Sequence, residues 1–160
     1  MTALHDRLKT RPALVQADLD EVRERLSDDD LPRAPREGMR TVRAQLAEIA
    51  GTERQLMAWL RNREHVSFEI TNDFGERGRS FAGMKEVLYE ERANTLGYMD
   101  SLSEVKLETP APMPQWWFES LKQPPIQPSE VFRSLAQHEW YHVGQLVSYL
   151  WSRGDDPYKW

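Results

Sequence analysis

Cysteine is absent from the sequence, and this absence limits the chemistry that the chain can perform. Disulfides and thiolate metal sites are excluded, so any metal ligand has to be a histidine or a carboxylate. No apolar run approaches the roughly 20 residues that cross a bilayer. The opening residues MTALHDRLKT also lack the apolar stretch of a signal peptide. These absences predict a cytoplasmic protein without a membrane segment.

A concentrated basic surface is lacking as well. The chain has 21 Lys and Arg against 26 Asp and Glu, a net charge of −5, and its basic residues occur only in short mixed stretches. Because phosphate binding needs clustered Lys and Arg, we expect no nucleic-acid partner. With 39% hydrophobic and 29% charged residues in 160, the composition is that of a folded protein. We expect a single domain over residues 1–160.

Four stretches carry apolar residues at the three- and four-residue spacing of helices with one buried face. They span residues 13–26, 39–61, 80–107 and 129–153. Ser80 and Ser129 are the expected N-caps of the last two helices, and Gly154 is the expected stop signal. Pro12 suits either a first helical turn or a kink in a helix that begins near Thr2.

The segments between these stretches are long and differ in character. Residues 27–38 are acidic and contain two prolines, and residues 62–79 form an irregular crossing with room for a short extended piece. Six prolines between residues 109 and 128 forbid a long helix there. The sequence therefore predicts an all-α fold, a four-helix bundle with long crossover connections.

The letters HEWYH at residues 138–142 carry the most distinctive chemistry. His138 and His142 lie four residues apart, so on a helix they share one face and can bind a single ion. Two neutral imidazoles suit a transition metal rather than calcium or magnesium. The letters also match the HExxH signature of zinc proteases, in which Glu139 would be the general base. Only 18 residues follow His142, none of them His or Glu, and Ser148 stands where the extended signature needs a third histidine. A protease is therefore the least favoured interpretation.

A third ligand has to come from another helix. On the helix over residues 129–153, Glu139 falls within the apolar stripe, while the two histidines lie on its polar flank. On the helix over residues 39–61, Glu53 falls within the stripe and Glu48 on a flank. Both Glu48 and Glu53 are candidates for the third ligand, and periodicity alone does not choose between them.

The segment His138-Glu-Trp-Tyr-His142-Val-Gly144-Gln145 resembles the last helix of the DinB/YfiT-like superfamily. Members of that superfamily are four-helix bundles with long crossings and one metal ion. Their second helix carries a further histidine ligand in a segment that resembles residues 46–54 of this chain, with Glu48 at the histidine position. The resemblance therefore implies a site of Glu48, His138 and His142. The carboxylate at this position implies either a changed metal preference or the loss of the metal.

The same resemblance implies a function. Related bundles include transferases and isomerases that depend on bacillithiol or mycothiol, so we expect a metal-dependent S-transferase acting on electrophilic small molecules. The implied cofactors are one divalent transition metal, zinc or nickel first and iron or manganese as alternatives, together with a low-molecular-weight thiol. The expected partners are a small-molecule substrate or thiol and a second copy in a homodimer. The alternative is a non-catalytic, stress-associated bundle that binds a metal or small ligand.

Several other side chains have structural interpretations. We expect Glu139 to form a salt bridge and Glu53 to be the buried partner of Arg92 or Arg133. His5 and His65 lie in weakly patterned regions and are expected to be solvated.

The aromatic residues have structural interpretations too. Tyr141 is expected at solvent or at a subunit interface, and Tyr149 in the core, with pocket lining as its alternative. For the cluster at residues 116–118, two tryptophans and a phenylalanine, core packing, a lid over the metal and a subunit interface stay open.

Overall fold

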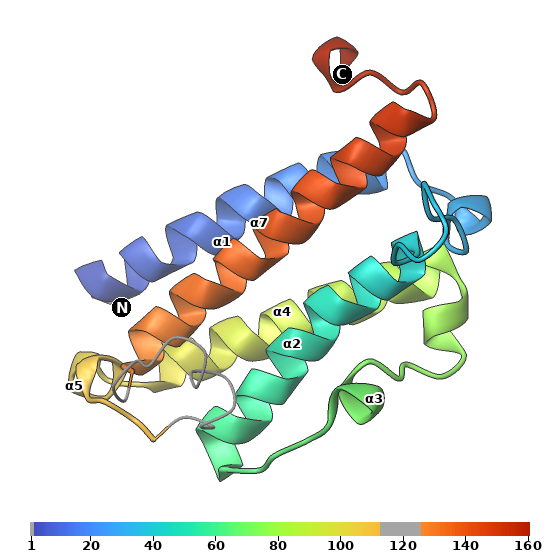
Figure 1. Ribbon diagram of the computed structural model, residues 1–160. Coiled ribbons are helices and arrows are strands. Elements are labelled where there is room, and N and C mark those ends of the chain that lie inside the picture. Colours follow the sequence, from blue (N-terminus) through green and yellow to red (C-terminus); the bar gives the residue numbers. More distant parts are fainter. Residues whose placement is uncertain (1, 113–125) are drawn as a thin grey trace.

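The computed structural model describes residues 2–112 and 126–160 and shows an all-helical bundle (Figure 1). Its four long helices are α1 (Ala3–Arg23), α2 (Val42–Asn62), α4 (Phe81–Ser101) and α7 (Pro128–Ser152). Short helices α3 (Phe68–Thr71) and α5 (Glu104–Glu108) and the 3₁₀ turns η1 (Asp28–Asp30), η2 (Arg77–Arg79) and η3 (Pro157–Lys159) lie between or after them. The predicted all-α fold is confirmed. The cluster at residues 116–118 lies outside the described residues.

The four long helices pack as two parallel pairs that run in opposite directions (Figure 1). Helix α1 lies beside α7, while α2 lies beside α4 and also contacts α7. Since α2 and α4 run the same way, the connection between them has to return along the bundle, and residues 63–80 make this crossing. The crossing contains α3 and η2 and no extended strand within those residues, so the extended piece considered for it is not found.

The helix ends agree only in part with the sequence predictions. Ser80 caps α4, since its Oγ accepts from the backbone N–H of Gly83 at 3.1 Å. Helix α7 begins one residue before the expected cap: Pro128 occupies its first turn, where a missing N–H does no harm, so Ser129 is not the N-cap. Gly154, with φ of +96°, follows the end of α7 as expected.

Two other helices differ in extent from their predictions. Helix α1 begins at Ala3 and contains Pro12 in its interior, so the earlier start is the correct one of the two alternatives. The single helix expected over residues 80–107 is divided. Leu102 adopts an extended backbone after α4, and Ser103 then caps α5 by accepting from the N–H of Lys106 at 3.3 Å.

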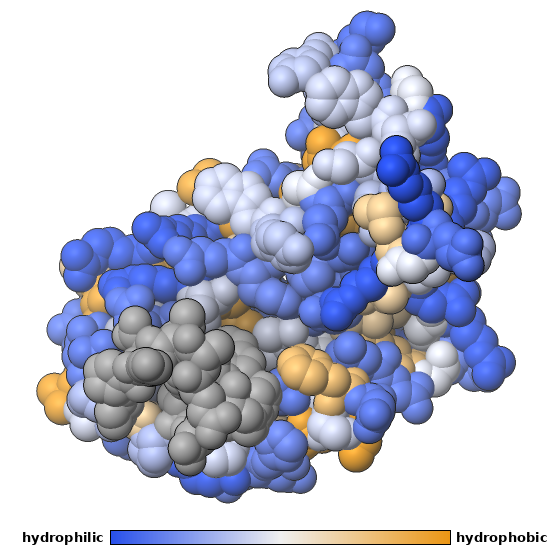
Figure 2. Space-filling view, in the orientation of Figure 1, coloured by the Kyte–Doolittle hydropathy of each residue, from blue (hydrophilic) through white to orange (hydrophobic). Residues whose placement is uncertain are grey.

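The core consists of two hydrophobic clusters at opposite ends of the bundle. On α2 and α4, the buried residues Glu53 and Arg92 lie between the segments that supply these two clusters. On α7, the buried Glu139 lies between Ala136 and Val143, which belong to the same cluster. The outer surface seen in Figure 2 is mostly hydrophilic, with hydrophobic atoms in small separate areas. Within the described residues, no helix combines the length and hydrophobicity that a membrane crossing needs. The bundle thus keeps its apolar faces inside and supports polar groups between its helices.

Candidate metal centre

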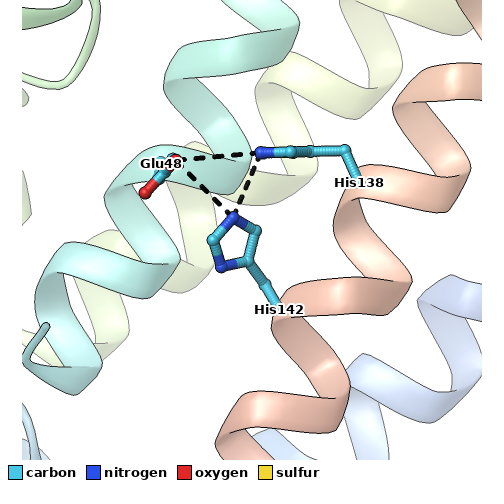
Figure 3. A group of neighbouring side chains, drawn as sticks. All are labelled: Glu48, His138 and His142. Carbon is cyan, nitrogen blue, oxygen red and sulfur yellow. Dashed lines mark hydrogen bonds and ion pairs between the residues drawn. The ribbon is translucent and has the colours of Figure 1, made fainter. Parts of the chain in front are cut away.

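Three potential metal ligands come together between α2 and α7. His138 and His142, one turn apart on α7, direct their rings toward α2, and Glu48 on α2 faces both of them (Figure 3). The His142 side chain is only 2% exposed, whereas those of Glu48 and His138 are 19% and 27% exposed. The structure therefore brings together the three residues that the resemblance selected, at a place partly open to solvent.

The spacing of the three ligand atoms fits a transition-metal ion. The two histidine Nε2 atoms lie 3.1 Å apart, and Glu48 Oε1 lies 3.9 Å from each of them. In a triangle with sides of 3.1, 3.9 and 3.9 Å, the point equidistant from the corners is roughly 2.1 Å from each corner. Zinc binds histidine nitrogen and carboxylate oxygen at about 2.0–2.2 Å. The cluster could hold a metal ion without rearrangement of its donor atoms.

Hydrogen bonds at the back of the site orient the His142 ring. The Tyr149 hydroxyl donates to the carbonyl oxygen of Arg40 at 2.7 Å, so its oxygen accepts from Gln45 Nε2 at 3.3 Å. This fixes the Gln45 amide with Oε1 toward the imidazole, where it accepts a hydrogen bond from His142 Nδ1–H. The proton on Nδ1 leaves the Nε2 lone pair of His142 directed at Glu48 and His138, as a metal ligand requires.

Burial keeps both imidazoles neutral. Desolvation lowers the pKa of His138 from 6.5 to about 4, and the positive charge of Arg40 adds to this effect. Desolvation likewise lowers the pKa of His142 to about 4, with further contributions from His138 and Arg40. At neutral pH neither ring has to lose a proton before it binds a metal ion, so protons compete weakly for the site.

Glu48 connects the ligand cluster to a cavity. Its Oε1 faces the two histidines, while its Oε2 pairs with the guanidinium of Arg40. A half-open cavity of about 660 Å³ lies beside it, bordered by residues of α2, α3, the loop that follows α3, η2 and the start of α4. Of the three ligand residues, Glu48 lines this cavity. A small molecule bound in the cavity would therefore contact the edge of the metal site.

The second candidate ligand, Glu53, belongs to a different network. Arg92 Nε donates to Glu53 Oε1 at 2.8 Å, Thr95 Oγ1 donates to Glu53 Oε2 at 2.6 Å, and Arg92 also pairs with Glu139. Burial, together with the nearby Glu53, raises the pKa of Glu139 to about 7, although Arg92 opposes this. The expected salt bridges of Glu53 and Glu139 are confirmed, with Arg92 as the shared partner, while Arg133 pairs with Glu130. A carboxylate bound to Arg92 in the core is not a free base, which removes the main support for a protease.

One histidine was assigned wrongly. His5 is buried, with 4% of its surface exposed, because it links α1 to the end of α4. Its Nε2 bonds to the carbonyl oxygen of Leu102 at 3.0 Å, and its Nδ1 bonds to the Thr2 hydroxyl at 2.8 Å. His65, by contrast, is exposed, as expected.

The structure places Tyr149 in the core and Tyr141 at the surface, as expected. Tyr149 lies in the core, and its hydroxyl supports Gln45. Tyr141 is 63% exposed. Sequence reasoning missed Gln45 altogether, although it lies three residues before Glu48, within an apolar stretch where a buried amide is unusual.

Fold and site together define a helical bundle with a two-histidine, one-carboxylate cluster that could hold one metal ion. A family model described as the DinB superfamily matches residues 13–146, and the chain belongs to this superfamily. No match was found among curated proteins or among solved structures. The matched region includes all three residues of the cluster.

Proposed function

We propose that this chain binds one divalent transition metal through Glu48, His138 and His142 and is a metal-dependent enzyme that transfers a low-molecular-weight thiol to electrophilic small molecules. Zinc or nickel is the preferred ion, and the carboxylate ligand also admits iron or manganese. One observation carries the proposal: Glu48 belongs both to the ligand cluster and to the wall of a cavity of about 660 Å³. Cavities of this size bind small molecules in many proteins.

The roles of the chain's own residues follow from the site. His138 and His142 are neutral donors, and Gln45 holds the His142 ring with Nε2 free. A bound transition metal would lower the pKa of a thiol that coordinates it, as it does for water. The chain contains no cysteine, so the sulfur nucleophile has to come from a bound molecule. The homodimer, the cytoplasmic location and the single-domain organisation stay predictions.

Conjugation of thiols to an electrophilic aryl halide tests the enzymatic part. The new sulfur–carbon bond forms as the halide leaves, and the thiol proton passes to solvent, so released halide and consumed thiol should match. We expect zinc- or nickel-loaded protein to accelerate this reaction for at least one of a panel of thiols, and His142→Ala to abolish the acceleration. Metal-loaded protein without any acceleration would favour the non-catalytic binder.

Circular dichroism and metal content accompany that assay. The His142→Ala variant should lose metal because His142 contributes a ligand nitrogen, and it should keep the helical spectrum of the wild type because alanine favours helix. Loss of the helical spectrum would instead mean that the variant is unfolded. His138→Ala, whose side chain is more exposed, would then replace it in the assay.

A further inference from the structure

The cavity beside Glu48 combines apolar lining residues with three exposed arginines. Ala44 and Ala47 of α2, Phe68 and Phe74 of the crossing, and Met84 of α4 supply apolar lining. The charged lining residues are three arginines, Arg40, Arg43 and Arg79, against two carboxylates, Glu48 and Asp73. An apolar body would fit inside such a cavity, while a charged end would lie beside the arginines.

The arginines differ in how their charge is compensated. Arg79 pairs with Glu76 at 2.6 Å, and Arg40 pairs with Glu48. Arg43 donates only to the backbone carbonyl of Arg79, at 3.4 Å, and forms no ion pair within the part of the chain that the structure describes. A guanidinium with no carboxylate partner at the edge of a cavity is suited to bind an anionic group of a ligand.

Arg40 is linked to the metal centre through Glu48. The Glu48 carboxylate divides its two oxygens between the histidine pair and Arg40. An ion held by Oε1 would draw charge from the carboxylate and weaken its attraction for Arg40. Arg40, whose side chain is 57% exposed, would then be available to a ligand in the cavity.

We infer that this cavity binds a small anion with an apolar body, such as an aryl or alkyl carboxylate, phosphate or sulfonate, and that metal at the centre strengthens this binding. The inference rests on the proposed function in one respect, since it names the class of substrate or thiol that would reach the same metal. Arg43 anchors the anionic group, and Arg40 joins it when Glu48 binds the ion. Cationic molecules are disfavoured, because both the exposed arginines and the ion would repel them.

Calorimetric titration with two matched probes tests the inference. Phenylacetate and its neutral amide, phenylacetamide, have nearly the same shape and differ in charge. We expect zinc-loaded wild-type protein to bind phenylacetate at millimolar concentration and phenylacetamide at least about tenfold more weakly. The variant Arg43→Gln should bind phenylacetate about tenfold more weakly than the wild type, with its zinc content unchanged.

Arg61→Gln is the matched control. Arg61 lies on the same helix, donates to the carbonyl oxygen of Asn94 at 2.7 Å and forms no ion pair among the described residues. It does not line the cavity, so the variant should bind phenylacetate as the wild type does. Removal of zinc should weaken phenylacetate binding several-fold in the wild type and have no such effect in Glu48→Gln.

The outcomes separate this inference from the proposed function. Equal binding of the two probes, no binding of either, or an Arg43→Gln variant that binds like the wild type overturns the anion site, whatever the zinc content. Wild-type protein that takes up no zinc overturns the metal centre. In that case charge selectivity that depends on Arg43 in the metal-free protein would still establish the anion site.

Discussion

Replacement of Arg92 by methionine should destabilise the bundle strongly. Arg92 is the shared cation of two buried carboxylates, Glu53 and Glu139, and along α4 it lies between the segments that supply the two hydrophobic clusters. The three side chains are 10%, 5% and 2% exposed. Arg92→Met fills similar space with an apolar side chain but leaves two carboxylates without their cation.

The magnitude follows from this burial. Breaking a buried ion pair by removing one partner costs about 3–5 kcal/mol, a large part of the roughly 5–15 kcal/mol that stabilises a typical domain. The pKa of Glu139 is already raised to about 7 and should rise further without Arg92. The folded variant then binds more protons than the unfolded chain above the ordinary glutamate pKa of 4.5, so its stability falls as pH rises. The deficit relative to wild type should therefore be larger at about pH 8 than at about pH 5.5.

Urea denaturation followed by circular dichroism measures the deficit at both pH values. The control is Arg77→Met, whose partner Glu90 and whose own side chain are both about half exposed and whose loss should cost at most about 1 kcal/mol. Adding Glu53→Gln and Glu139→Gln to Arg92→Met should restore part of the stability by removing the unpaired charges. If Arg92→Met lowers the free energy of unfolding by less than about 1 kcal/mol, or by an amount that does not change with pH, Arg92 does not neutralise Glu53 and Glu139 as described.

The remaining predictions concern the site's support, its protonation and two glycines. Gln45→Leu should lower metal affinity about 10–100-fold, because the His142 ring loses the hydrogen bond that orients it. Competition with a chromophoric chelator measures this affinity, and an unchanged value would contradict the role of Gln45 in orienting His142. In the presence of a chelator, the free energy of unfolding of the wild type should fall as pH falls from 6.5 toward 4. A variant with both site histidines replaced by Gln should lack this contribution to the fall. In that range the unfolded chain protonates histidines that the folded protein keeps neutral; a wild-type-minus-variant difference that does not change with pH would contradict the lowered pKa values. Gly83→Ala should destabilise the protein by about 1–3 kcal/mol, since its Cβ would collide with the Arg77 backbone. At Gly97 an added Cβ has no neighbour within 4 Å, so Gly97→Ala should stabilise the protein by up to about 1 kcal/mol. Equal melting temperatures for the two glycine variants would refute the expected difference between them.

The helical spacing of apolar residues was sufficient to predict the bundle. The stripes on the second and last helices placed Glu53 and Glu139 in the interior and Glu48 on a flank, which is where the structure has them. Periodicity could not choose between Glu48 and Glu53 because a stripe describes one helix at a time. The choice depends on how α2 is set against α7, and there the resemblance of residues 46–54 to the second helix of the DinB/YfiT-like superfamily supplied the missing information.

Other features depend on contacts that no local pattern encodes. Gln45 and Tyr149 are 104 residues apart, and the chain of hydrogen bonds that orients His142 exists only once α2 and α7 are packed. His5 was expected at the surface because its surroundings are weakly patterned, yet the carbonyl of Leu102 at the end of α4 accounts for its burial. Arg40 lies just before α2, where no sequence pattern marked it as part of the site, although its guanidinium pairs with the Glu48 carboxylate of the ligand cluster.

The most direct test of the metal centre is the zinc content of purified protein after equilibrium dialysis, measured for the wild type, Glu48→Ala and the control His65→Ala. His65 is exposed and not part of the cluster, so its loss should leave the site intact. The geometry predicts one zinc ion per chain in the wild type and in His65→Ala, and a large loss in Glu48→Ala. Wild-type protein without zinc, or equal zinc in Glu48→Ala, would contradict the assignment of Glu48, His138 and His142 as the metal ligands.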